Sequence, residues 1–161
     1  MKIKIKRLKP NTKLPTYAHP GDVGMDLYSL EEYILKPGER KIFPLGFALE
    51  FETGYAAIVK DKSSLSKNGL HTMGGVFDAG YRGEYNVLLV NLGQEPYKIE
   101  TGNKIAQLVI FPVIIAELSE TEKLADSSRG TGGFGSTGKW QAVRAACHPE
   151  RATASRGIPQ P

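Results

Sequence analysis

The residues best suited to chemistry in this chain lie in the run Arg-Gly-Thr-Gly-Gly-Phe-Gly-Ser-Thr-Gly at 129–138. Phe134 offers a ring that can stack on an aromatic ligand, and Arg129 offers a guanidinium that pairs with phosphate. Ser136 and Thr137 add hydroxyl donors, and the glycines leave backbone N–H groups unshielded. Because the run has little apolar surface to offset the entropy of folding, we expect a flexible arm. The pattern predicts an arm that closes over a nucleotide. A plain Gly-rich linker is the alternative for such a run taken alone.

A second chemical group lies in the glycine-rich stretch 72–91, TMGGVFDAGYRGEYNVLLVN. Asp78 and Tyr81 fall in a glycine-flanked hairpin turn, just before a strongly apolar strand. This spacing places a carboxylate and a phenol near one tight turn, which suits a pocket that presents a proton acceptor and a flat ring to a small ligand. Two surface groups at an ordinary turn are the alternative.

Three other segments place polar groups at turns or in a buried strand. Asp26 follows a glycine-containing turn and enters the next strand. Ser63 and Ser64 follow Lys62 at what reads as a helix start, which predicts either an anion site or ordinary helix capping. Gln107 stands alone in an apolar strand pattern, so it is either satisfied by the core backbone or faces a site.

Short strands must position these residues. Ile3 and Ile5 alternate with lysines, Pro37-Gly38 separates two β-rich runs, and GYAAIVK, YNVLLVN and KIAQLVIFPVII follow as further strands. Helical periodicity is nearly absent apart from a brief turn around 63–67. Many short strands at roughly even spacing predict an all-β fold, as a sandwich, jelly roll or barrel.

Composition limits the class of protein. A chain of 161 residues with 40% hydrophobic residues suits one compact domain. No run approaches the ~18 apolar residues of a membrane span, and the N-terminus alternates lysine with isoleucine, so we expect a cytoplasmic protein without membrane association. The single Cys147 cannot form an intrachain disulfide.

The basic balance is concentrated at the C-terminal end. The net charge is +4, and residues 139–161 contain four Lys or Arg against one acid, so the remainder carries about +1. This balance gives no footprint for long nucleic acid, and any anion site must be local. The tail has no sustained hydrophobic period, and we expect it to be disordered or loosely docked, with no assigned function.

Taken in order, these five segments make the chain resemble the trimeric dUTP diphosphatase (dUTPase) family. The resemblance covers residues 3–138, with DAGYRGE, KIAQLV and RGTGGFGSTG nearly unaltered. It implies a β jelly roll over 1–128, a flexible active-site arm over 129–139 and a disordered tail over 140–161. It also implies a homotrimer whose three active sites each draw on more than one subunit.

The same resemblance implies hydrolysis of dUTP to dUMP and pyrophosphate, which lowers dUTP and supplies dUMP for thymidylate synthesis. Asp78 would be the general base that activates water for attack on the α phosphorus. Tyr81 would pack against deoxyribose and exclude a ribose hydroxyl. The backbone from Thr72 through Gly75 to Val76 would read the uracil edge.

The resemblance also implies a set of phosphate ligands. Lys62, Ser63, Ser64 and Gln107 would hold the α and β phosphates. From the arm, Phe134 would stack over uracil, Gly135 would contact the substrate, and the γ phosphate would be held by Arg129, Ser136 and Thr137. Mg²⁺ would be chelated chiefly by the phosphates and water, with Asp26 either contacting the hydration shell or serving only its turn.

One departure and two alternatives accompany this interpretation. The family usually has Arg where Lys62 stands, and Lys lacks the planar bidentate fork. The related dCTP deaminases carry a catalytic Glu where this chain has Leu88, which cannot move protons, so deamination is disfavoured. A module that binds dUTP without turnover is the alternative from another class, and Asp78 and the complete arm argue against it.

Overall fold

The computed structural model describes residues 1–133, and all its strands lie in the folded unit Met1–Glu117. The all-β prediction is confirmed, since the one helix, α1 (Ser63–Ser66), is a single turn where the sequence predicted one. The strands are β1 (Lys4–Arg7), β2 (Gly24–Tyr28), β3 (Tyr33–Leu35), β4 (Arg40–Pro44), β5 (Phe47–Glu50), β6 (Tyr55–Lys60), β7 (Leu70–Met73), β8 (Val76–Asp78), β9 (Asn86–Asn91), β10 (Tyr97–Ile99) and β11 (Lys104–Pro112).

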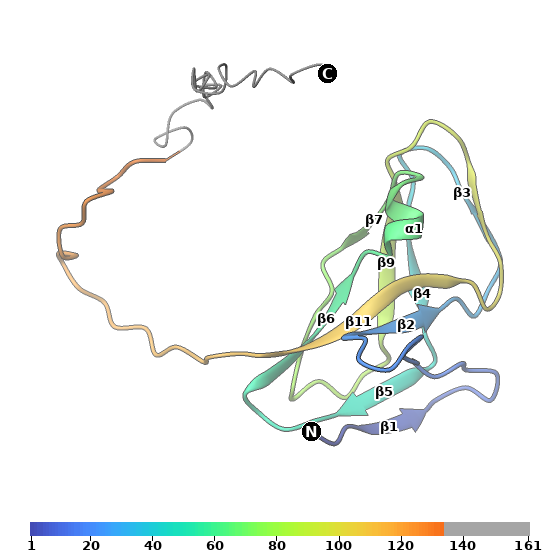
Figure 1. The fold of residues 1–161 in the computed structure, drawn as a ribbon, viewed down its shortest axis with the longest axis horizontal. Helices are drawn as coiled ribbons and strands as arrows, with labels where there is room; N and C mark the ends of the chain where they lie inside the picture. Colours follow the sequence, from blue (N-terminus) through green and yellow to red (C-terminus); the bar gives the residue numbers. More distant parts are fainter. Residues whose placement is uncertain (134–161) are drawn as a thin grey trace, which may run out of the picture. The chain divides into compact units, whose positions relative to one another are not determined.

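The strands pair antiparallel in four groups. The largest sheet has the order β2-β11-β6-β8, the second has β4-β9-β7, and β1-β5 and β3-β10 form two-stranded ribbons. Figure 1 shows the long β11 running between β2 and β6. Strands distant in sequence are therefore neighbours, which brings turn segments from across the chain together.

Alternation along the strands builds the core between the two larger sheets. Leu27, Val59 and Leu108 point inward from the four-stranded sheet, and Val87 and Leu89 point inward from the three-stranded sheet, all at most 2% exposed. Burying each of these side chains contributes about 1.5–3 kcal/mol. A one-residue slip would turn each set outward, so the core fixes the register.

The outward face of the four-stranded sheet carries the alternate residues. Its register sets Gln107 of β11 between Asp26 of β2 and Lys60 of β6. Farther along, an apolar stripe is formed by Ile58, Val76, Val109 and Phe111, of which Val76 is 66% and Phe111 43% exposed. This sheet thus presents polar groups and uncovered apolar groups on one surface.

Among the residues the structure describes, no helix is long and apolar enough to cross a bilayer.

Candidate active site

Asp26 forms the centre of a buried ion triad. Its side chain is only 4% exposed, with Lys62 Nζ 2.8 Å from Oδ1 and Lys104 Nζ 2.6 Å from Oδ2. The second contact is an ion pair. Burial alone would raise the pKa of Asp26, but the two ammonium groups outweigh it and hold the pKa below its ordinary 3.8. The triad keeps a net positive charge beside the neighbouring pocket.

That pocket, of about 310 Å³, brings together three of the residues predicted from the sequence. Asp26, Lys62 and Gln107 line it with Ala18, His19, Asp22, Val23 and Gly24. A Cβ at Gly24 would lie 2.3 Å from Gln107 Oε1, so the glycine leaves the space that the Gln107 amide occupies. Gln107 is half-buried and lines this pocket, which favours the interpretation that it faces a site.

Ser63 and Ser64 occupy the exposed first turn of α1. The N-cap position is Lys62, which makes no side-chain capping bond. The capping alternative is therefore wrong for these serines. Ser64 lines a second pocket of about 390 Å³, which also includes Lys62 and Lys104. The two lysines and the serine turn form one cationic, hydroxyl-bearing region.

β7 and β8 lie in different sheets and do not pair with each other, so the connection between them, residues 72–78 and called the hairpin below, is not a paired β-hairpin. It depends on two glycines. Gly74 and Gly75 have φ angles of 66° and 93°, the left-handed region that L side chains rarely adopt. The Gly75 carbonyl accepts a 2.8 Å hydrogen bond from Val59 N–H, and a Cβ at Gly75 would lie 2.9 Å from Val59 Cβ. The close approach of this turn to β6 therefore requires glycine, and Val76 begins β8 directly after it.

Asp78 ends β8 and opens the next turn, in which the Tyr81 N–H donates to the Asp78 carbonyl at 3.0 Å. The Asp78 side chain lies on the outward face and is exposed. One turn therefore holds both Asp78 and Tyr81, as the sequence predicted. It is not the predicted hairpin turn, because β8 and β9 belong to different sheets.

The Tyr81 ring is held by packing and by one hydrogen bond. It lies 5.5 Å from the Phe77 ring, which stacks on Tyr85 at 4.2 Å, and its hydroxyl donates to the Glu84 carbonyl at 3.1 Å. Burial raises the pKa of Tyr85 to about 12, so Tyr85 is a neutral support beneath the pair. A Cβ at Gly83 would lie 2.3 Å from the Tyr81 hydroxyl oxygen. The ring, 39% exposed, thus offers a fixed flat surface.

The hairpin and the phosphate-type pocket stand apart within one chain. Asp78 lies opposite Ala56 of β6, and Gln107 lies opposite Lys60 on the other side of the same strand. Four residue steps along β6 and two strand spacings across it separate their Cα atoms by about 16 Å. Both side chains rise from the same face and so do not converge. Within one chain the predicted residues therefore form two separate groups, one around Asp78 and Tyr81 and one around Lys62 and Gln107.

The sequence analysis missed two polar residues, Lys104 and Asp61. Lys104 completes the ion triad, and Asp61 Oδ1 accepts a 2.7 Å hydrogen bond from the backbone N–H of Thr72. A signal was present in the sequence, because Asp61 directly precedes Lys62 and Lys104 lies three residues before Gln107. The partners of Asp61 and Lys104, however, are remote in sequence. In the stretch before the described residues end, Arg129 Nε donates to the Gly132 carbonyl at 3.0 Å. The predictions for Phe134, Gly135, Ser136 and Thr137 lie outside the described residues.

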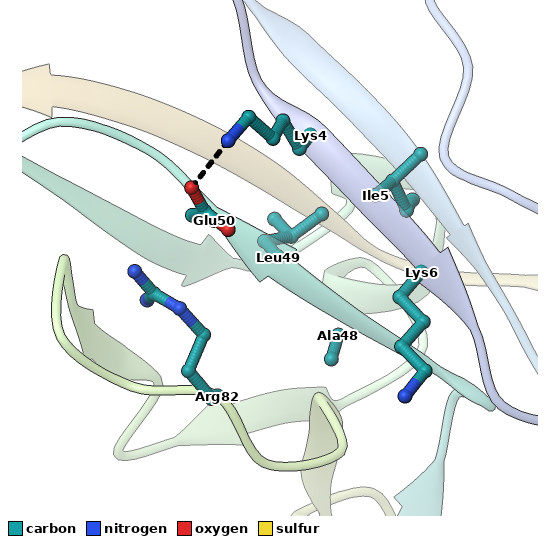
Figure 2. A pocket seen from close by; sticks show the side chains of 7 residues that line it. All are labelled: Lys4, Ile5, Lys6, Ala48, Leu49, Glu50 and Arg82. Atoms are coloured by element: carbon teal, nitrogen blue, oxygen red, sulfur yellow. Dashed lines mark hydrogen bonds and ion pairs between the residues drawn. The ribbon is translucent and has the colours of Figure 1, made fainter.

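A separate groove of about 400 Å³ holds none of the predicted site residues. Figure 2 shows Lys4 of β1 paired with Glu50 of β5 at 2.7 Å, and Arg82 extending from the β8–β9 loop. Its remaining lining is Ile5, Lys6, Ala48 and Leu49. Within residues 1–133, no three His, Cys, Asp or Glu side chains are grouped to hold a metal.

The chain is similar to several known proteins. A deoxyuridine 5'-triphosphate nucleotidohydrolase of Nautilia profundicola is 46% identical over 142 residues, covering 86% of this chain and 100% of that protein. The dUTPase of Staphylococcus bacteriophage 80alpha, solved with dUPNHPP, has a TM-score of 0.80 at 29% identity, covering 86% and 99%. A mutant dUTPase from phage phi11 of S. aureus, which reveals the coordination of a structural Mg(II) ion, has a TM-score of 0.73 at 25% identity, covering 78% and 100%. The dUTPase family model matches residues 10–138, and the chain belongs to the dUTPase family.

Proposed function

We propose that this chain hydrolyses dUTP to dUMP and pyrophosphate, with Asp78 and Tyr81 at the reacting end of the substrate. The activity is that of its family and of the relatives described above. The observation that carries the residue assignment is the turn after β8, which presents an exposed carboxylate beside a packed ring. dUPNHPP, bound in the phage 80alpha enzyme, is an analogue of dUTP.

In this mechanism Asp78 accepts a proton from the water that attacks the α phosphorus. The leaving group is pyrophosphate, and no covalent intermediate is needed. Tyr81 packs on deoxyribose at C2′, where a ribose hydroxyl would collide with the ring. The backbone of residues 72–76 reads uracil, because a fixed hairpin can match one donor and acceptor pattern and reject another.

The phosphates are held by the pocket beside the ion triad. Lys62 and Gln107 line it, and Ser63 and Ser64 supply hydroxyl donors from the adjacent turn. The paired Asp26 carboxylate keeps the lysine ammonium groups in place while leaving a net positive charge for the phosphates. Arg129, Phe134, Gly135, Ser136 and Thr137 complete the site from the arm.

We infer that Mg²⁺ would bind to the triphosphate of the substrate rather than to the protein. Both Asp26 oxygens face ammonium groups, so this carboxylate does not fit the role of a direct metal ligand. The triphosphate oxygens and water are the hard ligands that Mg²⁺ prefers. When bound there, the ion neutralises charge that develops on the leaving phosphates.

The separation of the two groups of residues supports a site shared between copies of the chain, which we propose form the homotrimer that the family resemblance implies. A general base and the ligands of the phosphate it acts on must approach the same phosphorus, and about 16 Å between Cα atoms in one chain is too far for side chains that rise in parallel. A second copy can bring its hairpin to the first copy's phosphate pocket. The exposed apolar stripe on the same sheet face, with Val76 and Phe111, provides a surface for that contact.

Pyrophosphate release tests the function. We expect turnover of dUTP with Mg²⁺ and little turnover of dCTP, dTTP or UTP. Tight binding of dUTP without pyrophosphate would support a sensing module instead, and comparable turnover of all four nucleotides would contradict the proposed uracil and deoxyribose recognition.

A further inference from the structure

Asp61 connects the phosphate-binding turn to the uracil-reading hairpin. It lies between β6 and α1, directly before Lys62, and its side chain is 28% exposed. Oδ1 accepts hydrogen bonds from the Thr72 backbone N–H at 2.7 Å and the Thr72 hydroxyl at 2.5 Å. Oδ2 lies 2.5 Å from His71 Nδ1. One carboxylate thus makes three contacts with two adjacent residues of β7.

These contacts join two different sheets. β6 belongs to the four-stranded sheet, whereas β7 belongs to the three-stranded sheet. Thr72 lies just before the Gly74–Gly75 turn, and within that turn the Gly75 carbonyl accepts a hydrogen bond from the Val59 N–H of β6. The hairpin is therefore held at two points. The Asp61 side chain, just after β6, holds Thr72, and a backbone hydrogen bond from Val59 of β6 holds Gly75.

The contacts with Thr72 and His71 stabilise the ionised form of the Asp61 carboxylate. Burial would raise the pKa of Asp61, but the hydrogen bonds from Thr72 and the contact with His71 outweigh it and lower the pKa from its ordinary value. Hydrogen bonds to a carboxylate are shorter and stronger than those between neutral groups. An amide at this position could keep the bond to the Thr72 N–H while losing the charge.

We propose that Asp61 is a positioning residue for base selection: by fixing Thr72, its carboxylate sets the backbone that reads uracil. This inference rests on the proposed function. Asp61 does not contact the reacting atoms in this role. Loss of the tie lets the residue 72–76 backbone move, so the match to uracil weakens and the mismatch to cytosine is no longer enforced.

The variants D61A and D61N test the tie by steady-state kinetics with dUTP and dCTP. We expect D61A to lower kcat/KM for dUTP by about 10-fold, mainly through KM, because base reading is made in the ground state. The dUTP/dCTP ratio of kcat/KM should fall as well. D61N should lose only about 3-fold, because its amide oxygen can still accept the Thr72 N–H. Glu52→Ala, which removes an exposed acid from the loop between β5 and β6, is the matched control and should match the wild type.

A general loss of stability must be separated from this effect. Leu35→Ala opens the core in β3, which pairs with β10 and not with β7, and should lower the melting temperature without changing the dUTP/dCTP ratio. If D61A does not fold, Thr72→Val removes one of the three contacts and should still lower that ratio. The inference is overturned if the folded D61A or T72V variant keeps the wild-type ratio, if L35A lowers it equally, or if D61N is as impaired as D61A. Absence of dUTP turnover in the wild type would instead overturn the proposed function.

Discussion

At the scale of single residues, the proposed mechanism assigns the general base to the carboxylate of Asp78. Asp78→Asn keeps the size and most hydrogen bonding of the side chain but removes its basicity. We expect kcat to fall by about 100-fold or more, as for loss of general-base catalysis. Binding of dUPNHPP, measured by calorimetric titration, should remain near that of the wild type. Near-normal turnover in the variant would reject Asp78 as the base.

Asp26 predicts a pH dependence of stability. Because its folded pKa lies below 3.8, its contribution is present above that pH and is lost as the pH falls through the folded pKa. Asp26→Asn should lower the free energy of unfolding at pH 7 by about 2 kcal/mol or more, less than a fully buried pair would because Lys104 is 42% exposed. Urea melts should show this difference constant from pH 7 to 5 and shrinking below pH 3.8. A difference that is as large at pH 2 as at pH 7 would contradict the ionic origin.

The residue types in the site were predictable, but several of their partners were not. The Asp78 and Tyr81 pair is local, since three residues separate them and one turn holds both. Asp26 was expected at a turn or near a metal hydration shell, whereas its partners Lys62 and Lys104 arrive through the folding of β6 and β11. Alternation and turn residues record local conformation and carry little information about such long-range ion pairs.

At the scale of elements, the β7–β8 turn depends on backbone that only glycine adopts easily. Gly75→Ala adds both a left-handed φ penalty and a 2.9 Å contact with Val59 Cβ. Gly54→Ala is the matched control, because Gly54 has φ 87° and open space around its Cβ position. We expect G54A to cost about 1–2 kcal/mol of stability and G75A more, with most activity lost only in G75A. Thermal melts and pyrophosphate release measure the two effects, and equal loss of activity in both variants would contradict this role of the turn.

Strand positions were largely predictable, but their pairing was not. The apolar runs of β6, β9 and β11 and the turns between them are visible in the sequence. The order β2-β11-β6-β8 is not, because the alternating pattern of each strand is compatible with several neighbours. The register shift between Lys104 and Ala106, a local irregularity of the β11–β2 pairing, has no sequence signal of its own.

At the scale of the whole molecule, a site shared between chains predicts complementation. Asp78→Asn and Gln107→Ala should each be nearly inactive alone. Co-expressed, they should form mixed trimers in which about one site in three combines an intact hairpin with an intact neighbouring pocket. Pyrophosphate release from doubly tagged, co-purified trimers measures this recovery. Activity no greater than that of the parent variants would place both residues in one chain's site.

The C-terminal region makes a second prediction at this scale. Since the strands lie within Met1–Glu117, ending the chain at Ser127 should leave the melting temperature and oligomer nearly unchanged. It should abolish most activity, because the arm at 129–138 is removed. Ending the chain at Lys139 is the control and should preserve turnover. Melting curves and pyrophosphate release compare the two, and full activity of the shorter chain would refute the closing arm.

The position of β6 between the hairpin and the phosphate pocket has a consequence for how activity depends on the amount of protein. If each active site needs residues from two neighbouring copies, an isolated chain contains every required residue and is still inactive. Dilution below the assembly's dissociation constant would then extinguish hydrolysis without unfolding a single chain, and reconcentration would restore it. Catalysis would begin only when the concentration of the chain is high enough for copies to assemble, so the concentration of the protein would itself control its activity.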